Sequence, residues 1–598
     1  MRKFIALTGA LLLALPGLAF AQVKTQTKGG DWAAQPTAPG DFTRAFKLPQ
    51  KIGDVTINFR SRVDIDFQSN RNQDFDSDQA DSALLPTTTF GGGAAGPKTP
   101  GRKGEFFEFE DLRFGFDASG DRWAIHTVME ADDLIADREG ADSVIHVERW
   151  WGDYDFGYFN IRIGNQIVGI EPGAMVWTDD DAVARIYKDY GTVAWSIYYS
   201  KRQDADSGID FDAVAGRGGV GAPPGGALTS QTGIGNDQDV IAATLELAFA
   251  NPIGAGTLSF APFFVYNDDK RFQRGLGVLG PAGPAAGAAC GITCDGDLQV
   301  YTAGATIAGK IWQIDSVLAG AYQWGDDNTG INSVNPVTGS LRKADIAAWY
   351  AFANLAWPIP NTPLTIGAGV MVVSGDDDPF DDKAKGYLGV AHNTEFGGGL
   401  GGIDIWVDEF DTAIKLRDNL GPGGTIRTGN SAPAGNAMFL TTDDDPTPLG
   451  LSNVAGVFGL PAAGIASGSG PALDPDRHNN RSHPGVIMAN ANLSYRATKD
   501  LLTRVDVNPI WFYSTDGFHP FLSSTTVTPS GLSAAAGIDK YVGTEIVFTS
   551  LWRPWGSPYF SINPGVAVII PGSGIEDLTG TDDIAVKFHV SFTWSLGI

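Results

Sequence analysis

Hydrophobic and polar residues alternate over the last segment of the chain. From Ile584 to Ile598 every second residue is apolar, and the residues between them are small, polar or charged. A period of two places successive side chains on opposite faces of a strand, so it excludes a helix face. The same alternation recurs over 55–67, 159–167 and 364–372. The pattern predicts β-strands with one apolar face and one polar or small-residue face.

These strands are long, at roughly 10 to 15 residues, whereas strands of soluble proteins average about 5 or 6. A tilted strand that crosses a membrane needs about 9 to 11 residues. Short and long connections alternate along the chain. The short turns are expected at 118–121, 309–310, 358–362, 498–500 and 553–558.

The sequence therefore predicts an all-β fold: a transmembrane antiparallel β-barrel of about 18 strands, with long extracellular loops, short periplasmic turns and both termini in the periplasm. Sixteen strands is the alternative if the weaker segments 122–132, 144–155 and 181–190 are not strands. Aromatic residues near strand ends predict a girdle at the membrane surfaces. They are Trp324, Trp357, Trp511, Trp552, Trp555, Tyr559 and Trp594.

The ends and one internal segment lie outside this pattern. Residues 1–21 have a basic start, an apolar run and the small-residue end Ala19-Phe20-Ala21, which fits a signal peptide. Residues 22–50 are expected to form a periplasmic N-terminal extension, and 51–598 the transmembrane barrel. Within it, 374–484 lacks a sustained period, which predicts a long loop that stays outside or folds into the pore.

The net charge argues against one class of partner, and the two cysteines predict a disulfide. Removing Arg2 and Lys3 from the 42 basic residues leaves 40 against 69 acidic residues, a formal charge of −29, which argues against nucleic acid. The two cysteines, Cys290 and Cys294, lie in a Gly- and Ala-rich stretch of an exported chain, which favours a local disulfide.

Inward-facing charges are the candidate pore lining, because a charge on the lipid face costs about 2 to 4 kcal/mol at the bilayer midplane. Two interpretations stay open: cross-strand ion pairs that fill the lumen, and a charged eyelet that selects solutes. The predicted pore-lining residues are Arg60, Arg62, Asp64, Asp66, Arg162, Arg496, Arg504, Asp506, Glu545 and Lys587.

Acidic clusters at 179–181, 376–382 and 443–445 are expected in outer loops. Carboxylates at this density make Asp376, Asp377, Asp378 and Asp381 candidate calcium ligands, although the chain has no EF-hand pattern. The alternative is a solvated loop surface. No other cofactor is expected, and no nucleophile and base pair indicates an enzyme.

Four segments carry a family resemblance: Ser374 to Lys383 (SGDDDPFDDK), Val542 to Glu545 (VGTE), Ile569 to Gly572 (IIPG) and Ile161 to Gln166 (IRIGNQ). They resemble the alginate-export family of outer-membrane porins. The resemblance implies an 18-stranded barrel that passes hydrophilic, often anionic solutes by diffusion.

The expected function is that of a porin in the outer membrane of a Gram-negative cell. Its partners would be membrane lipid, lipopolysaccharide and small hydrophilic solutes, among them anionic ones, with a homo-oligomer as an open alternative. The alternative function is a β-barrel sheath of a porin–cytochrome electron-transfer complex, which would need a haem protein on another chain.

Overall fold

A computed structural model gives the structure of the chain. The described residues are 50–71, 105–132, 145–171, 176–203, 238–252, 256–269, 298–327, 344–377, 381–387, 389–392, 485–516, 537–557, 560–579, 582 and 584–596. The predicted signal peptide, nearly all of the N-terminal extension and most of 374–484 lie outside them.

Strands make up almost all of the regular structure. Of the 21 strands in the described part of the chain, three are short: β1 (Gln50–Ile52), β15 (Lys383–Ala384) and β16 (Ala391–His392). The other eighteen are β2 (Val55–Arg71), β3 (Glu105–Ser119), β4 (Trp123–Asp132), β5 (Ile145–Asp155), β6 (Asn160–Gly169), β7 (Trp177–Asp189), β8 (Val193–Gln203), β9 (Gln238–Ala250), β10 (Thr257–Asp269), β11 (Leu298–Ile311), β12 (Ile314–Asp327), β13 (Ala344–Pro358), β14 (Leu364–Val373), β17 (Val486–Thr498), β18 (Leu501–Phe512), β19 (Tyr541–Trp552), β20 (Phe560–Pro571) and β21 (Ala585–Leu596).

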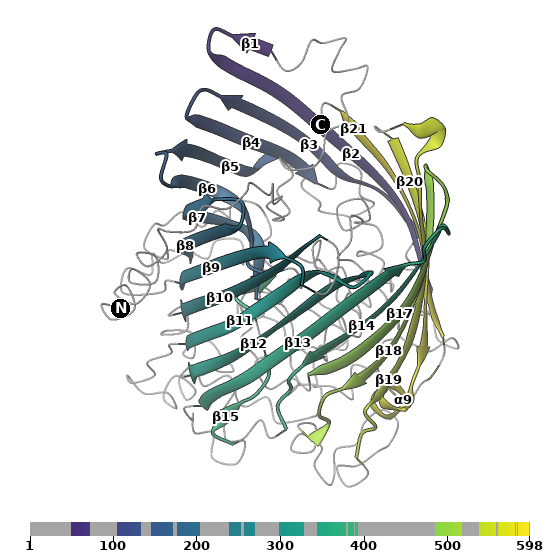
Figure 1. Cartoon of the computed structure of the whole chain (residues 1–598). Helices are drawn as coiled ribbons and strands as arrows, with labels where there is room; N and C mark the ends of the chain where they lie inside the picture. The colour runs from purple at the N-terminus through teal and green to yellow at the C-terminus, as the bar shows by residue number, and fades with distance from the viewer. Residues whose placement is uncertain are drawn as a thin grey trace, which may run out of the picture.

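The eighteen long strands form one closed ring. Each pairs antiparallel with the long strand before and after it, and β14 pairs directly with β17 across the long connection. The last strand, β21, pairs with β2 from Ser61↔Leu596 to Arg71↔Val586, which closes the sheet into a barrel (Figure 1). The predicted all-β antiparallel barrel with eighteen strands is confirmed.

Strict alternation sorts side chains between the two faces of the wall. On β13, Tyr350 and Phe352 are buried, whereas Leu355 and Trp357, of opposite phase, are exposed. Such an apolar outer surface would be an aggregation hazard on a soluble protein, and it is what a lipid-facing wall requires. Exposed apolar residues of the same outward phase include Phe114, Ile125, Met129, Trp150, Ile163, Ile186, Tyr199, Phe260, Ile307, Tyr322, Ile366, Val370, Leu493, Val505, Val507 and Phe548.

Connection lengths distinguish the two rims. The turns after β3, β5, β7, β9, β11, β13, β17 and β19 are short, and all of them lie at one end of the barrel, here named the short-turn rim. The other end, the long-loop rim, carries the longer connections. By analogy with bacterial barrels the short-turn rim is the periplasmic side. One connection at the long-loop rim, 170–176, is itself short.

Two predicted boundaries are wrong. The turn expected at 309–310 lies at 312–313, because β11 runs to Ile311 and β12 begins at Ile314. The acidic cluster 179–181 was expected in an outer loop, but β7 begins at Trp177 and contains it. Asp181 is buried and accepts a hydrogen bond of 2.6 Å from Nε1 of Trp177. An inward-facing carboxylate with an indole donor is compatible with a strand, because its hydrogen bond offsets its desolvation.

Exposed aromatic side chains ring the short-turn rim. They include Trp123, Tyr158, Tyr190, Trp312, Trp357, Trp552 and Trp555. A second group, in which Tyr301 stacks on Trp324 at 5.8 Å, lies towards the long-loop rim. Twelve residues separate Trp312 from Trp324, which corresponds to roughly 28 Å at 3.3 Å per residue and a tilt near 45°. This spacing matches the hydrocarbon thickness of a bilayer. Of the predicted girdle residues, Trp324, Trp357, Trp552, Trp555 and Trp594 are exposed, Trp511 is half-buried, and Tyr559 lies outside the described residues.

Helical structure in the described residues is limited to α9 (Ser573–Thr579), which packs beside β19, and the 3-10 turn η9 (Pro554–Gly556). No helix among these residues is long and apolar enough to cross a bilayer.

Candidate functional site

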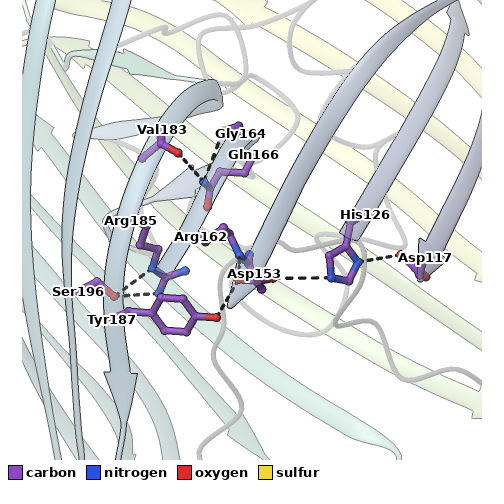
Figure 2. A network of polar contacts seen from close by, with 10 residues as sticks. All are labelled: Asp117, His126, Asp153, Arg162, Gly164, Gln166, Val183, Arg185, Tyr187 and Ser196. Carbon is purple, nitrogen blue, oxygen red and sulfur yellow. Dashed lines mark hydrogen bonds and ion pairs between the residues drawn. The ribbon is translucent and has the colours of Figure 1, made fainter. Parts of the chain in front are cut away.

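A polar network lines the inner face of β3 to β8, near the short-turn rim. Figure 2 shows the side chains of this network, which come from β3 to β8. Gln166 donates to the backbone carbonyls of Gly164 and Val183, and the other members form a chain of side-chain contacts. Their phase is opposite to that of the exposed apolar residues on the same strands, so strand alternation alone places them inside. Its members are Asp117, His126, Asp153, Arg162, Gln166, Arg185, Tyr187 and Ser196.

Asp153 on β5 is the centre of this network. Its Oδ1 accepts hydrogen bonds from Nε of Arg162 at 2.8 Å and from the hydroxyl of Tyr187 at 3.0 Å. Its Oδ2 lies 3.7 Å from Nε2 of His126. The other ring nitrogen, Nδ1 of His126, lies 2.8 Å from Oδ1 of Asp117. One carboxylate therefore connects strands β4, β6 and β7.

The two arginines of the network, Arg162 and Arg185, differ in the groups that compensate their charge. Arg162 pairs with Asp153, and Arg185 lies directly opposite Arg162 in the β6–β7 register. Directly opposed like charges destabilise a sheet, so each guanidinium needs compensation. Arg162 obtains it from Asp153 and from the Trp151 ring, 5.3 Å away.

Among the described residues, no carboxylate contacts Arg185. Its Nε and Nη2 donate to Oγ of Ser196 at 3.1 and 2.9 Å. Its guanidinium lies over the rings of Tyr187 and Tyr198, with 4.5 and 5.0 Å to the ring centres. Aromatic faces and a hydroxyl stabilise a cation without neutralising it. Arg185 therefore keeps a positive charge on the lumen wall.

A second polar cluster lies on β17 to β19, on the far side of the ring. Arg504 forms a two-pronged pair with Asp506, with Nε to Oδ2 and Nη2 to Oδ1 both at 2.8 Å. Nδ2 of Asn490 donates to Asp506 and Asn508, and Asn508 donates to buried Glu545 at 3.1 Å. Arg504 is almost completely buried, so this cluster is a structural ion pair in a hydrogen-bonded network.

The structure divides the predicted pore-lining residues into three groups: paired residues, an exposed residue, and residues whose side chains are not described. Arg162, Arg504, Asp506 and Glu545 face inward, as phase predicted, but the structure brings them together as pairs and networks. Arg496 is exposed at the short-turn end of β17. The remaining candidates lie on β2 and β21 as predicted, but their side chains are outside the described set; they are Arg60, Arg62, Asp64, Asp66 and Lys587.

Sequence reasoning did not select Asp153, Arg185 and Tyr187, and took His126 as an ordinary polar residue of the barrel. Strand alternation places all four side chains on the inner face, as it does Arg162, so the sequence contained this signal. The sequence did not give the register between β5 and β6, which sets Asp153 opposite Arg162.

The calcium hypothesis meets a lysine in the structure. Nζ of Lys385 contacts Oδ1 of Asp377 and lies 3.5 Å from Oδ2 of Asp381. Partial burial lowers the pKa of Lys385, but the hydrogen bond to Asp377 and the nearby carboxylates outweigh it and raise the pKa above its ordinary value. An ammonium thus lies where a cation would bind.

Among the described residues no group of three metal-binding side chains is close enough to hold an ion. Asp378 lies outside those residues, so calcium stays a prediction. Cys290 and Cys294 lie outside them as well, and their disulfide also stays a prediction.

Comparison with known proteins gives similar structures but no sequence match. No protein-family model matches the chain. No curated protein matches its sequence either. Among solved structures, OccK5 (OpdH) of Pseudomonas aeruginosa is 9% identical and has a TM-score of 0.40, over 91% of this chain and 99% of that one.

Two further solved structures match most of the chain at similarly low identity and TM-score. OccK11 (OpdR) of Pseudomonas aeruginosa is 7% identical, with a TM-score of 0.38 over 92% of this chain and 97% of that one. OmpT, an outer membrane protein of Vibrio cholerae, is 7% identical, with a TM-score of 0.30 over 91% and 99%. At these scores the barrel assignment rests on the closed strand pairing. None of the three is described as an alginate exporter, so that resemblance stays an expectation.

Proposed function

We propose that this chain is a passive channel in the outer membrane of a Gram-negative cell, where it lets small hydrophilic solutes diffuse across. The observation that carries the proposal is the division of one closed wall into an apolar outer face and a charged inner network. A closed barrel satisfies every backbone hydrogen bond without water, so it can span a bilayer. Contact with lipid and lipopolysaccharide follows from that location.

For solute class, we propose that small anions are favoured, through Arg185. Within the inner network, Arg162 is balanced by Asp153. Among the described residues, Arg185 contacts a hydroxyl and aromatic faces but no carboxylate. A carboxylate that passes this point can accept charge-assisted hydrogen bonds from it.

The cytochrome-sheath alternative has less support. A sheath needs an empty lumen, whereas described residues 384–387, 389 and 390 lie against the inner wall and include the fully buried Ala384 and Tyr387. A homo-oligomer stays a prediction.

Single-channel recording tests the proposal. Purified protein that is β-rich by circular dichroism and heat-modifiable on gels would be inserted into planar lipid bilayers. We expect discrete conductance steps and a reversal potential in a salt gradient that favours anions. Absence of steps, both for this protein and for the strap variants described below, would contradict the channel.

A further inference from the structure

The inner wall of the barrel has two layers of different character. The polar network lies near the short-turn rim. Towards the long-loop rim, buried polar side chains such as Gln238, Asn267 and Gln323 lie among many apolar ones. The apolar ones include Val240, Val300, Ile346, Val373, Met488 and Ile510, each at most 3% exposed. We name this part the apolar layer. It is unusual for a channel, because the interior of an open porin is polar and wet.

A described segment packs onto this layer. The described residues 381–387 and 389–392, which we name the strap, follow β14 after a short interval. At one end β15 pairs in parallel with β13, with Ile346 opposite Ala384. At the other end β16 pairs in parallel with β7, with Trp177 opposite Ala391. Since β7 and β13 are separated around the ring by β8 to β12, the strap reaches from one part of the wall to another.

Hydrogen bonds fix the base of the strap. The hydroxyl of Ser374, just after β14, accepts from the backbone N–H of Trp349 at 2.8 Å and donates to the carbonyl of Lys385 at 2.7 Å. The backbone N–H of Tyr387 donates to the carbonyl of Ser374 at 3.1 Å. Near the far end, the N–H of Val390 donates to the carbonyl of Val176 at 2.7 Å.

Apolar contacts fill the space between these two ends. The ring of Tyr387, fully buried, packs edge-on against Tyr350 of β13 with 5.0 Å between ring centres. Residues from β13 and from the strap therefore meet inside the barrel. Ala384, Tyr387 and Val390 belong to the same buried cluster as the apolar layer.

We propose that the strap is a hydrophobic gate: it closes the outer half of the lumen on the β6 to β14 side, and its displacement widens the path to the polar network. A dry apolar constriction resists the passage of water and ions, which is how hydrophobic gates work. The parallel pairings involve only two residues at each end, so the strap can detach while the eighteen-strand ring stays paired. This inference rests on the proposed channel function.

Three variants test the gate. Tyr387→Ala removes the ring that packs on Tyr350, which should shift the open-to-closed ratio about a hundredfold. Lys383→Gln, at an exposed side chain in β15, is the matched control. In a Cys290→Ser/Cys294→Ser background, Ile346→Cys/Ala384→Cys joins the directly paired residues and locks the strap when oxidised.

Single-channel conductance and heat-modifiable mobility are measured for each variant. We expect the roughly hundredfold higher open-to-closed ratio for Tyr387→Ala, no change for Lys383→Gln, and a drop in conductance on oxidation of the locked variant that reducing agent reverses. If Tyr387→Ala does not assemble, Ser374→Ala, which removes two hydrogen bonds from the base of the strap, replaces it.

Equal conductance in the parent, the released variant and the oxidised locked variant would overturn the gate while leaving the channel intact. No conductance in any of them would overturn the channel itself.

Discussion

Nε of Arg162 lies 2.8 Å from Oδ1 of Asp153, directly across the β5–β6 pair. The predicted selectivity arginine is therefore one half of an ion pair. Because Oδ1 of Asp153 also accepts a hydrogen bond from the Tyr187 hydroxyl, one carboxylate joins β5, β6 and β7. On the next strand, Arg185 contacts no carboxylate among the described residues.

Arg185→Gln should reduce anion preference. The variant keeps most of the packing between Tyr187 and Tyr198 but loses a charge-assisted hydrogen bond, worth about 1.5 kcal/mol and hence roughly tenfold in binding of a small carboxylate. The reversal potential in a salt gradient should move towards cations. Arg185→Lys is the control, since it retains the charge. Equal potentials for all three proteins would remove Arg185 from the selectivity assignment.

Asp153→Asn should act in the opposite direction. Loss of the carboxylate leaves the Arg162 guanidinium without its counter-charge, so anion preference should rise, and the barrel should lose about 1 to 3 kcal/mol of stability. Asp155→Asn, at an exposed position of the same strand end, is the matched control and should change both quantities less. The measurements are the reversal potential and the temperature at which gel mobility shifts.

Gly164→Ala should damage assembly. Gly164 has φ of +138°, and a Cβ there would lie 2.1 Å from the carbonyl oxygen of Trp150. Strain of this kind costs on the order of 1 to 3 kcal/mol or more. Gly152→Ala on the paired strand is the control, because its added Cβ would lie 3.8 Å from the carbonyl of Ala124. A normal thermal transition for Gly164→Ala would show that the strand shifts register easily.

The strap should loosen in alkaline solution. The pKa of Lys385 is raised in the folded strap, so the charge that holds Asp377 and Asp381 is complete at neutral pH. It is lost only as the pH rises through that raised value, above about pH 10. Conductance should therefore rise with alkali in the parent protein. Lys385→Met should show the higher conductance already at neutral pH, with no further alkaline step; an identical alkaline step in both would assign it to another group.

The sequence by itself determined the strands, their faces and the direction of the chain through the wall. Alternation is a local property of a strand, so the phase of Arg162 and Arg504 could be read directly, as could the short turn around Thr498. The start of β7 was missed because Asp179, Asp180 and Asp181 form a continuous acidic run, which is typical of a loop. A tertiary contact, the Trp177 donor, accommodates Asp181 in the strand.

Only the tertiary structure decided which charges are neutralised and what enters the lumen. Whether Arg162 meets Asp153 depends on the register between β5 and β6, and a shift of one residue would turn the carboxylate to the other face. The strap depends on contacts between residues far apart in sequence, such as Ala391 with Trp177. Nothing in the local pattern of 374–392 specifies them, because such contacts form only when the closed ring brings β7 and β13 to face the same interior.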